Sequence, residues 1–135
     1  MPDNWREVGF LIGNVFSMTS KIEWVLRIGV FGTFLGHGLL AISVNPAWIP
    51  YLTTLGLEPE QIKVIMPMIG SLDILVALWI LLKPNKYVVL WAVFWALATA
   101  IIRPLSGELF IAFVERAANW AAPLALYFYR FNKEV

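Results

Sequence analysis

Four long apolar segments separated by short polar stretches dominate the pattern of the chain. They cover residues 22–43, 62–82, 87–102 and 109–130. A helix of about 20 apolar residues spans the hydrocarbon core of a bilayer, so the segments are long enough to cross, the third being the shortest. The short loops between the last three make neighbouring helices antiparallel. The pattern predicts an all-α fold, an integral membrane four-helix bundle in a single transmembrane domain over residues 1–135.

Capping signals and turn residues mark the predicted helix ends. Ser20 with Glu23 three residues later reads as a capping box that opens the first membrane helix. Glu58 followed by Pro59 places an acid at the positive end of the second helix and proline at its first position. Turns are predicted at residues 83–85 and 104–107.

Two segments outside the predicted spans carry helical patterns of their own. Residues 3–18 place apolar side chains at helical spacing, which is typical of a helix lying in the membrane interface. Asp3 and Glu7 interrupt this segment and disfavour a signal peptide. The first loop, NPAWIPYLTTLGLEPE, is too polar and proline-rich to cross, and we expect a short, lid-like helix at the bundle mouth.

Composition supports the membrane prediction and narrows the chemistry. Hydrophobic residues make up 60% of the 135 residues and charged residues 14%, too few to cover a soluble core. The absence of cysteine excludes disulfides and cysteine-ligated metal, and one histidine excludes two-histidine haem ligation within a chain. No metal site or cofactor motif is expected. The net charge of +1 makes nucleic acid an unsuitable partner.

Five ionisable residues fall inside the predicted spans: Arg27, His37, Asp73, Glu115 and Arg116. Each costs about 3 kcal/mol in hydrocarbon unless it is paired or hydrated, so we expect them to face the bundle interior. At a rise of about 1.5 Å per residue, most of these groups lie in the outer half of the bilayer.

Helical spacing groups these residues with further polar and aromatic side chains. Trp91, Trp95, Thr99 and Arg103 recur at four-residue steps on the third span, so two indoles lie below two polar groups. The combined faces predict an outward-opening polar pocket with a tryptophan floor. Its candidate lining is Thr33, His37, Asp73, Trp91, Trp95, Thr99, Arg103, Glu115, Arg116 and Asn119.

Structural roles compete with ligand binding for these residues. Glu115 and Arg116 can form an intramembrane ion pair that positions helices, and Asp73 can pair with Arg27. His37 can be a packing histidine. If Asp73 does pair with Arg27, positive charge is left over at the pocket, and an acidic or carbonyl-bearing headgroup would balance it.

A stripe of small residues, Gly29, Gly32 and Gly36, lies on the first predicted span. Such stripes let helices approach closely. The stripe predicts close packing of this helix against another helix, either inside the chain or in a homodimer. The lipid bilayer is expected to cover the remaining surface of the bundle.

The quoted residues resemble the DoxX-like family of small four-span bacterial membrane proteins. The resemblance covers roughly residues 22–130 and is carried by RIGVFGTFLGHGLL, by the acid in the second span and by RPLSGELFIAFVERAANWAAPLAL. In the last segment Arg103, Pro104, Gly107, Glu115, Arg116, Asn119 and Pro123 stand together. The resemblance implies a four-helix bundle in the bacterial inner membrane, and some relatives are subunits of quinone-linked sulfur or terminal oxidase systems.

Three functions remain open, and the sequence does not decide whether the protein is an enzyme. The first is a small component of a membrane redox system that binds quinone and works with partner subunits. The second is a noncatalytic docking subunit of a larger membrane complex. The third is a small proton-coupled carrier with Asp73 or Glu115 as its titrating group, although no internal repeat supports it.

Positive residues predict the orientation, with both termini in the cytoplasm. One side carries Arg6, Lys21, Lys83, Lys86, Arg130 and Lys133, and the other carries Lys63 and Arg103. Because positive residues favour the cytoplasm, a C-terminal fusion to green fluorescent protein should fluoresce and a fusion to alkaline phosphatase should be inactive. An active phosphatase fusion in a correctly inserted protein would contradict this orientation.

Overall fold

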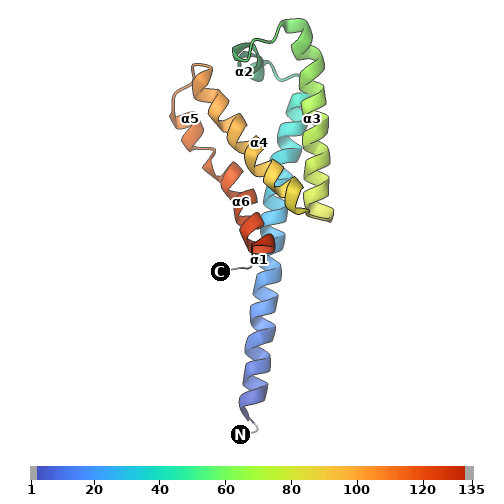
Figure 1. The fold of residues 1–135 in the computed structure, drawn as a ribbon, viewed down its shortest axis with the longest axis vertical. Coiled ribbons are helices and arrows are strands. Elements are labelled where there is room, and N and C mark those ends of the chain that lie inside the picture. The colour runs from blue at the N-terminus through green and yellow to red at the C-terminus, as the bar shows by residue number, and fades with distance from the viewer. Residues whose placement is uncertain (1–2, 133–135) are drawn as a thin grey trace.

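The computed structural model describes residues 3–132, except for the side chains of Asp3, Val15 and Phe16. Lys133, included in the positive count above, lies outside this range. Every regular element among the described residues is a helix and none is a strand, which confirms the all-helical prediction (Figure 1). The elements are α1 (Asp3–Ile42), η1 (Pro46–Trp48), α2 (Ile49–Thr54), α3 (Pro59–Leu82), α4 (Lys86–Leu105), α5 (Ile111–Val114) and α6 (Ala117–Phe131).

Three of the described helices, α1, α3 and α4, are long and apolar enough to cross a membrane. They cover the first three predicted spans, except for Ser43 at the end of the first. In Figure 1, α3 runs beside α1, while α4 crosses in front and leads to α5 and α6. The C-terminal end of α6 returns to the middle of α1.

The N-terminal segment is not a separate interfacial helix, which corrects the prediction for residues 3–18. α1 runs without interruption over 40 residues, so Ser20 and Glu23 lie inside it rather than at its start. No proline interrupts this stretch, and a capping box starts a helix only where the preceding residue leaves helical geometry. At about 1.5 Å per residue, α1 is about 60 Å long, and its first part extends beyond all other helices (Figure 1).

The prediction of one continuous helix over residues 109–130 is wrong. The backbone breaks at Glu115 and Arg116, which separate α5 from α6. The Arg116 N–H donates to the Phe113 carbonyl instead of the Ala112 carbonyl. The Arg116 guanidinium donates to the Ala112 carbonyl at 2.9 Å and takes the place of the missing helical bond. The side chain thereby stabilises the break.

The other element ends follow the local sequence closely. α3 begins at Pro59 with Glu58 as N-cap, and the Glu58 N–H donates to the Gln61 side chain at 2.9 Å. Residues 83–85 form the α3–α4 turn, as predicted. The short helix in the first loop is confirmed as α2. α4 continues through Pro104 to Leu105, so the next turn starts later than predicted and includes Gly107 at a φ of +99°.

The closest helix contact joins α1 to α3 at Gly38 and Gly70. A Cβ on Gly70 would lie 2.5 Å from the Gly38 carbonyl oxygen and 2.7 Å from the Ile42 nitrogen. The predicted stripe of Gly29, Gly32 and Gly36 makes no such contact, because a Cβ there would have no described atom within 4 Å. Within the chain the close packing therefore uses different glycines.

A charged cluster holds the helices together at the opposite end of α3. The Arg27 side chain is buried and donates to the carbonyl oxygens of Ile80 and Leu81, in the last turn of α3. Glu23 lies 3.8 Å from Arg27 and forms an ion pair with Arg130 of α6. Cations are favourable at a helix C-terminus, so Arg27 anchors α3 and does not pair with Asp73.

Replacing Gly70 with alanine should force α1 and α3 apart and destabilise the protein by about 1–3 kcal/mol, the usual effect of overpacking. Thermal unfolding of the purified protein in detergent measures the change. The control is Gly13→Ala, where the methyl group meets open space and alanine is the better helix former. Equal melting temperatures for the two variants would contradict the assigned contact.

Candidate functional site

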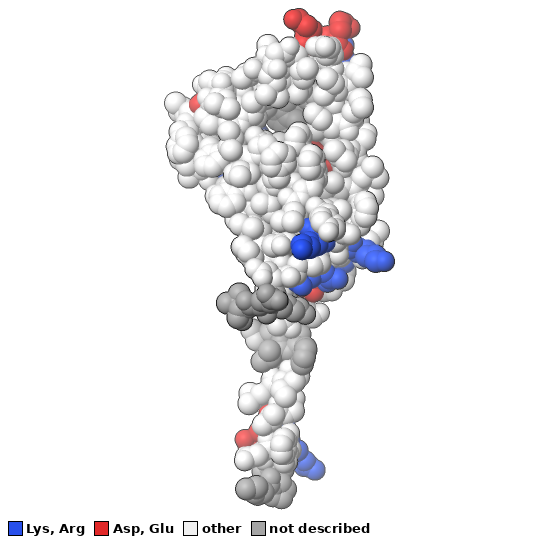
Figure 2. Space-filling view, viewed as in Figure 1, with Lys and Arg blue, Asp and Glu red and all other residues white. Residues whose placement is uncertain are grey.

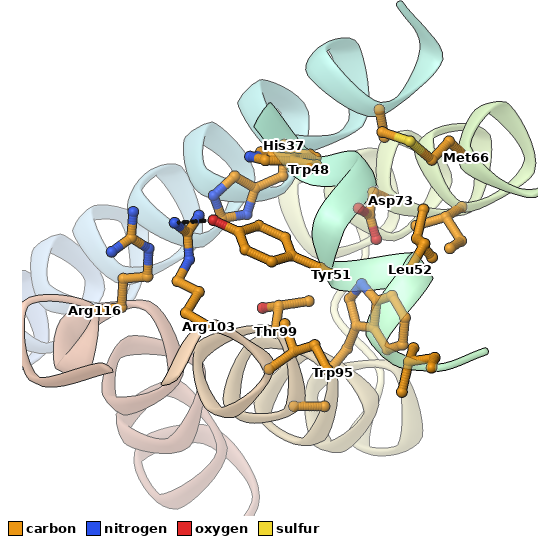
Figure 3. Close-up of a pocket in the computed structure, with 15 residues that line it drawn as sticks. His37, Trp48, Tyr51, Leu52, Met66, Asp73, Trp95, Thr99, Arg103 and Arg116 are labelled. Carbon is orange, nitrogen blue, oxygen red and sulfur yellow. Dashed lines mark hydrogen bonds between the residues drawn. The ribbon is translucent and has the colours of Figure 1, made fainter. Parts of the chain in front are cut away.

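A cavity of about 220 Å³ lies between α1, α3 and α4, with α2 above it (Figure 3). Figure 2 shows the molecule hollowed in its upper part. The residues lining this pocket are His37, Ala41, Trp48, Tyr51, Leu52, Leu55, Met66, Ile69, Asp73, Trp95, Ala98, Thr99, Ile102, Arg103 and Arg116. The pocket is therefore mostly apolar, with a few polar groups at separate places on its wall.

The structure brings together six of the ten residues predicted for the pocket. They are His37, Asp73, Trp95, Thr99, Arg103 and Arg116. They come from α1, α3, α4 and the break before α6. Polar side chains far apart in the sequence therefore surround one cavity.

The other four predicted residues, Thr33, Trp91, Glu115 and Asn119, do not line the pocket. The Thr33 hydroxyl donates to the Gly29 carbonyl of its own helix at 3.1 Å. Trp91 stacks on the outer side of Trp95, with ring centroids 5.7 Å apart. Glu115 is exposed, and Asn119 is partly buried in the first turn of α6 without contributing to the pocket lining. Only one indole therefore forms part of the predicted tryptophan floor.

Asp73 lies deep on the pocket wall, with 3% of its surface exposed. Its carboxylate points into the cavity, and the Trp95 indole nitrogen points towards it (Figure 3). Oδ1 has no hydrogen-bond partner among the described residues. A buried polar atom without a partner is costly and calls for a functional or structural explanation.

Hydrogen bonds of the Tyr51 hydroxyl hold α2 over the pocket. Arg103 Nη1 donates to the Tyr51 hydroxyl oxygen at 2.8 Å (Figure 3), and this hydroxyl donates to the Glu108 carboxylate. The Arg103 guanidinium lies 3.6 Å from Glu108 and 5.0 Å from the centre of the Tyr51 ring. Burial raises the pKa of Tyr51, as does its hydrogen bond to Glu108. The hydroxyl therefore keeps its proton up to and beyond its ordinary pKa of about 10.

His37 packs against Trp48 of η1, the short helix that directly precedes α2. Its imidazole meets the Trp48 indole edge to face, with ring centroids 5.5 Å apart and the planes at 78°. Edge-to-face contacts of this kind are favourable between aromatic rings. His37 thus combines the predicted packing role with a place on the pocket wall.

Arg116 reaches the pocket from the break between α5 and α6. Its guanidinium forms an ion pair with Glu115 and also donates to the Ala112 carbonyl. Because Glu115 and Arg116 are adjacent in the chain, this pair does not join two helices as the sequence prediction supposed. The ion pair neutralises the charge of Arg116 at the edge of the cavity.

Two features of the pocket were not predicted from the sequence: the apolar side chains of its wall and the hydrogen bonds of Tyr51 to Arg103 and Glu108. Met66 and Ile69 precede Asp73 by seven and four residues, and Ala98 and Ile102 follow Trp95 by three and seven. These spacings place each set on one helix face, so extending the candidate faces would have found them. No local signal connects Tyr51 with Arg103 and Glu108, because that contact depends on the loop conformation.

Comparisons with protein-family models, curated proteins and solved structures found no match. The resemblance to the DoxX-like family therefore rests on the quoted residues alone. Any function has to be argued from the pocket itself.

The pocket has the character of a binding site for a small molecule. Such sites are concave and mostly apolar, with a few polar groups that orient the ligand. The cavity of about 220 Å³ is below the usual range of roughly 300–1,000 Å³, which favours a single-ring headgroup over a large cofactor. The described residues contain no group of three or more His, Cys, Asp or Glu arranged to hold a metal ion.

Replacing Tyr51 with phenylalanine should loosen α2, because it removes both the bond from Arg103 and the bond to Glu108. Access of a reagent to the pocket can be measured with a cysteine introduced at Ala98 on the pocket wall. This cysteine is the only thiol in the chain. Its reaction with N-ethylmaleimide should be about tenfold faster in the Y51F variant, since hydrogen bonds to charged groups contribute roughly 1.5–3 kcal/mol. Tyr87→Phe, at an exposed tyrosine outside the pocket, is the control. Equal rates in Y51F and Y87F would show that Tyr51 does not close the pocket.

Proposed function

We propose that the chain is a multi-pass inner-membrane protein that binds a small quinone-type amphiphile beneath α2, as a component of a membrane redox system. The observation that carries the proposal is the apolar pocket with Asp73 on one wall and Arg103 and Arg116 near its rim. An amphiphile with a polar ring and an apolar tail matches that distribution. The chain offers no recognisable electron carrier of its own, so partner subunits would supply electron transfer.

Membrane insertion is supported by the distribution of charge along the molecule. Acidic residues gather at the end where α3 begins, and basic residues gather near the α3–α4 turn (Figure 2). Glu58 and Glu60 lie at the first end, and Lys83 and Lys86 at the second. The surface between them is mainly uncharged in this view. The α3–α4 turn and the C-terminal end of α6 lie towards the same end, in keeping with the proposed cytoplasmic side (Figure 1).

The break between α5 and α6 is compatible with a fourth crossing. Irregular backbone at membrane depth is tolerated where it is buried in protein or lines a cavity. Arg116 at the break lines the pocket, and its side chain satisfies the Ala112 carbonyl. The proposed bundle thus has three continuous helices and one interrupted helix. A homodimer through Gly29, Gly32 and Gly36 stays a prediction.

A proton-coupled carrier is the second candidate, and the same break favours it. Carriers commonly bind substrates at interrupted helices near the middle of the membrane. A carrier should move a bound ligand into sealed vesicles in response to a proton gradient. A binding component of a redox system should bind without moving it.

Filling the pocket tests the proposal directly. Decylubiquinone should bind the wild-type protein in lipid nanodiscs, as measured by titration calorimetry, and Ala98→Phe should abolish binding because the new ring occupies the cavity. Ala125→Phe adds the same ring at an exposed position of α6 outside the pocket and should bind like the wild type. Undiminished binding by a folded A98F variant would exclude this pocket as the site.

A further inference from the structure

The pocket opens on the side of the molecule. Figure 2 looks across the long axis, along which α1 runs, and shows the hollow below α2. In the same view of Figure 1 this place lies between α3 and α4, which diverge from the turn that joins them. The opening therefore faces sideways, along the plane of the membrane that α1, α3 and α4 are proposed to cross.

The wall residues beside this opening lie at the depth of the hydrocarbon core. α3 has 24 residues and is therefore about 36 Å long, slightly more than the roughly 30 Å of a hydrocarbon core. Ile69 of the pocket wall lies near the middle of α3, and Trp95 and Ala98 lie near the middle of α4. In the proposed orientation, lipid and not water is outside the opening.

Three aromatic side chains of α4 lead from the cavity to the outer surface. Trp95 lines the pocket, and Trp91 stacks on it with ring centroids 5.7 Å apart and the planes at 9°. The Phe94 ring lies 5.7 Å from that of Trp91, and Phe94 is 60% exposed. We call Trp95, Trp91 and Phe94 the aromatic strip. All three lie in the middle half of α4, so the strip ends in lipid.

The cavity is too small to enclose a whole amphiphile. Its volume of about 220 Å³ suits a single ring and leaves no space for a long tail. On the outer side, the hydrogen bonds of Tyr51 to Arg103 and Glu108 hold α2 over the cavity. A tail leaving there would have to pass these charged groups, whereas the side opening is flanked by the aromatic strip.

We propose that the ligand enters from the bilayer as a long-tailed amphiphile: its ring occupies the cavity, and its apolar tail passes through the side opening along the aromatic strip into the lipid. This inference rests on the proposed function and adds the route of entry and the need for a lipid-soluble tail. Reagents dissolved in water and ligands dissolved in lipid then reach the cavity from different sides.

The test locates the tail, because its affinity is uninformative: lipid is as apolar as the aromatic strip, so contact with the strip adds little binding energy. A decylubiquinone analogue with a diazirine in the middle of its tail is irradiated with the protein in lipid nanodiscs, and the labelled residues are identified by mass spectrometry. Trp91 and Phe94 should be labelled. Decylubiquinone at about ten times its Kd should lower this labelling about tenfold, by mass action.

Trp79 is the matched internal control. It is a 52% exposed tryptophan of α3 outside the pocket, so it meets any probe dissolved in the lipid, and its labelling should not respond to the competitor. Ala98→Phe, which fills the cavity, should remove the competitor-sensitive labelling of the strip. Ala125→Phe should retain it.

A second analogue, with the diazirine on the ring, separates the two ways of failing. If the ring probe labels the pocket wall while the tail probe labels Phe110 and Ile111, where α5 begins, the tail leaves elsewhere and the inference is overturned. Labelling of the strip that the competitor does not reduce, beside a labelled pocket wall, also overturns it. Both results leave the proposed function standing. A ring probe that labels no pocket residue contradicts the proposed function itself.

Discussion

The approach of α1 and α3 at Gly38 and Gly70 determines where the pocket forms. Each glycine leaves no room for a side chain, because an added Cβ would meet the backbone of the other helix within 3 Å. His37 is adjacent to Gly38, and Asp73 lies one turn after Gly70. The contact thus brings an imidazole and a carboxylate to the same region, while Arg27 holds the far end of α3. α4 and α2 then cover a space that this helix pair has already defined.

The parts predicted correctly from the sequence depend on local chemistry. Glu58 with Pro59 starts α3 because both residues favour the first helical turn, and residues 83–85 reverse the chain because proline and asparagine disfavour its continuation. The positions of the first three spans follow from the lengths of the apolar segments alone. The facing of Asp73, Trp95, Thr99 and Arg103 follows from helical periodicity, which holds as long as the helix is continuous.

The incorrect parts depend on contacts between distant residues or on competition within the backbone. Packing inside the chain through Gly29, Gly32 and Gly36 is one such part, because the close contact forms at Gly38, where α3 offers another glycine, while the homodimer through the stripe stays a prediction. Arg116 competes with the helix for the Ala112 carbonyl, and hydropathy cannot show that competition. Pairing Asp73 with Arg27 neglected the carbonyls at the end of α3, which are the nearer acceptors for that arginine.

The central claim is that a small amphiphile occupies the space beneath α2. Photolabelling with an azidobenzoquinone, followed by mass spectrometry of the labelled peptides, tests it most directly. The account predicts cross-links on the pocket wall, at residues such as Leu52, Ile69 and Ala98, that excess decylubiquinone prevents. Cross-links confined to the outward-facing side chains of α3 and α4, such as Leu75, Trp79 and Phe94, and insensitive to competitor, would contradict it.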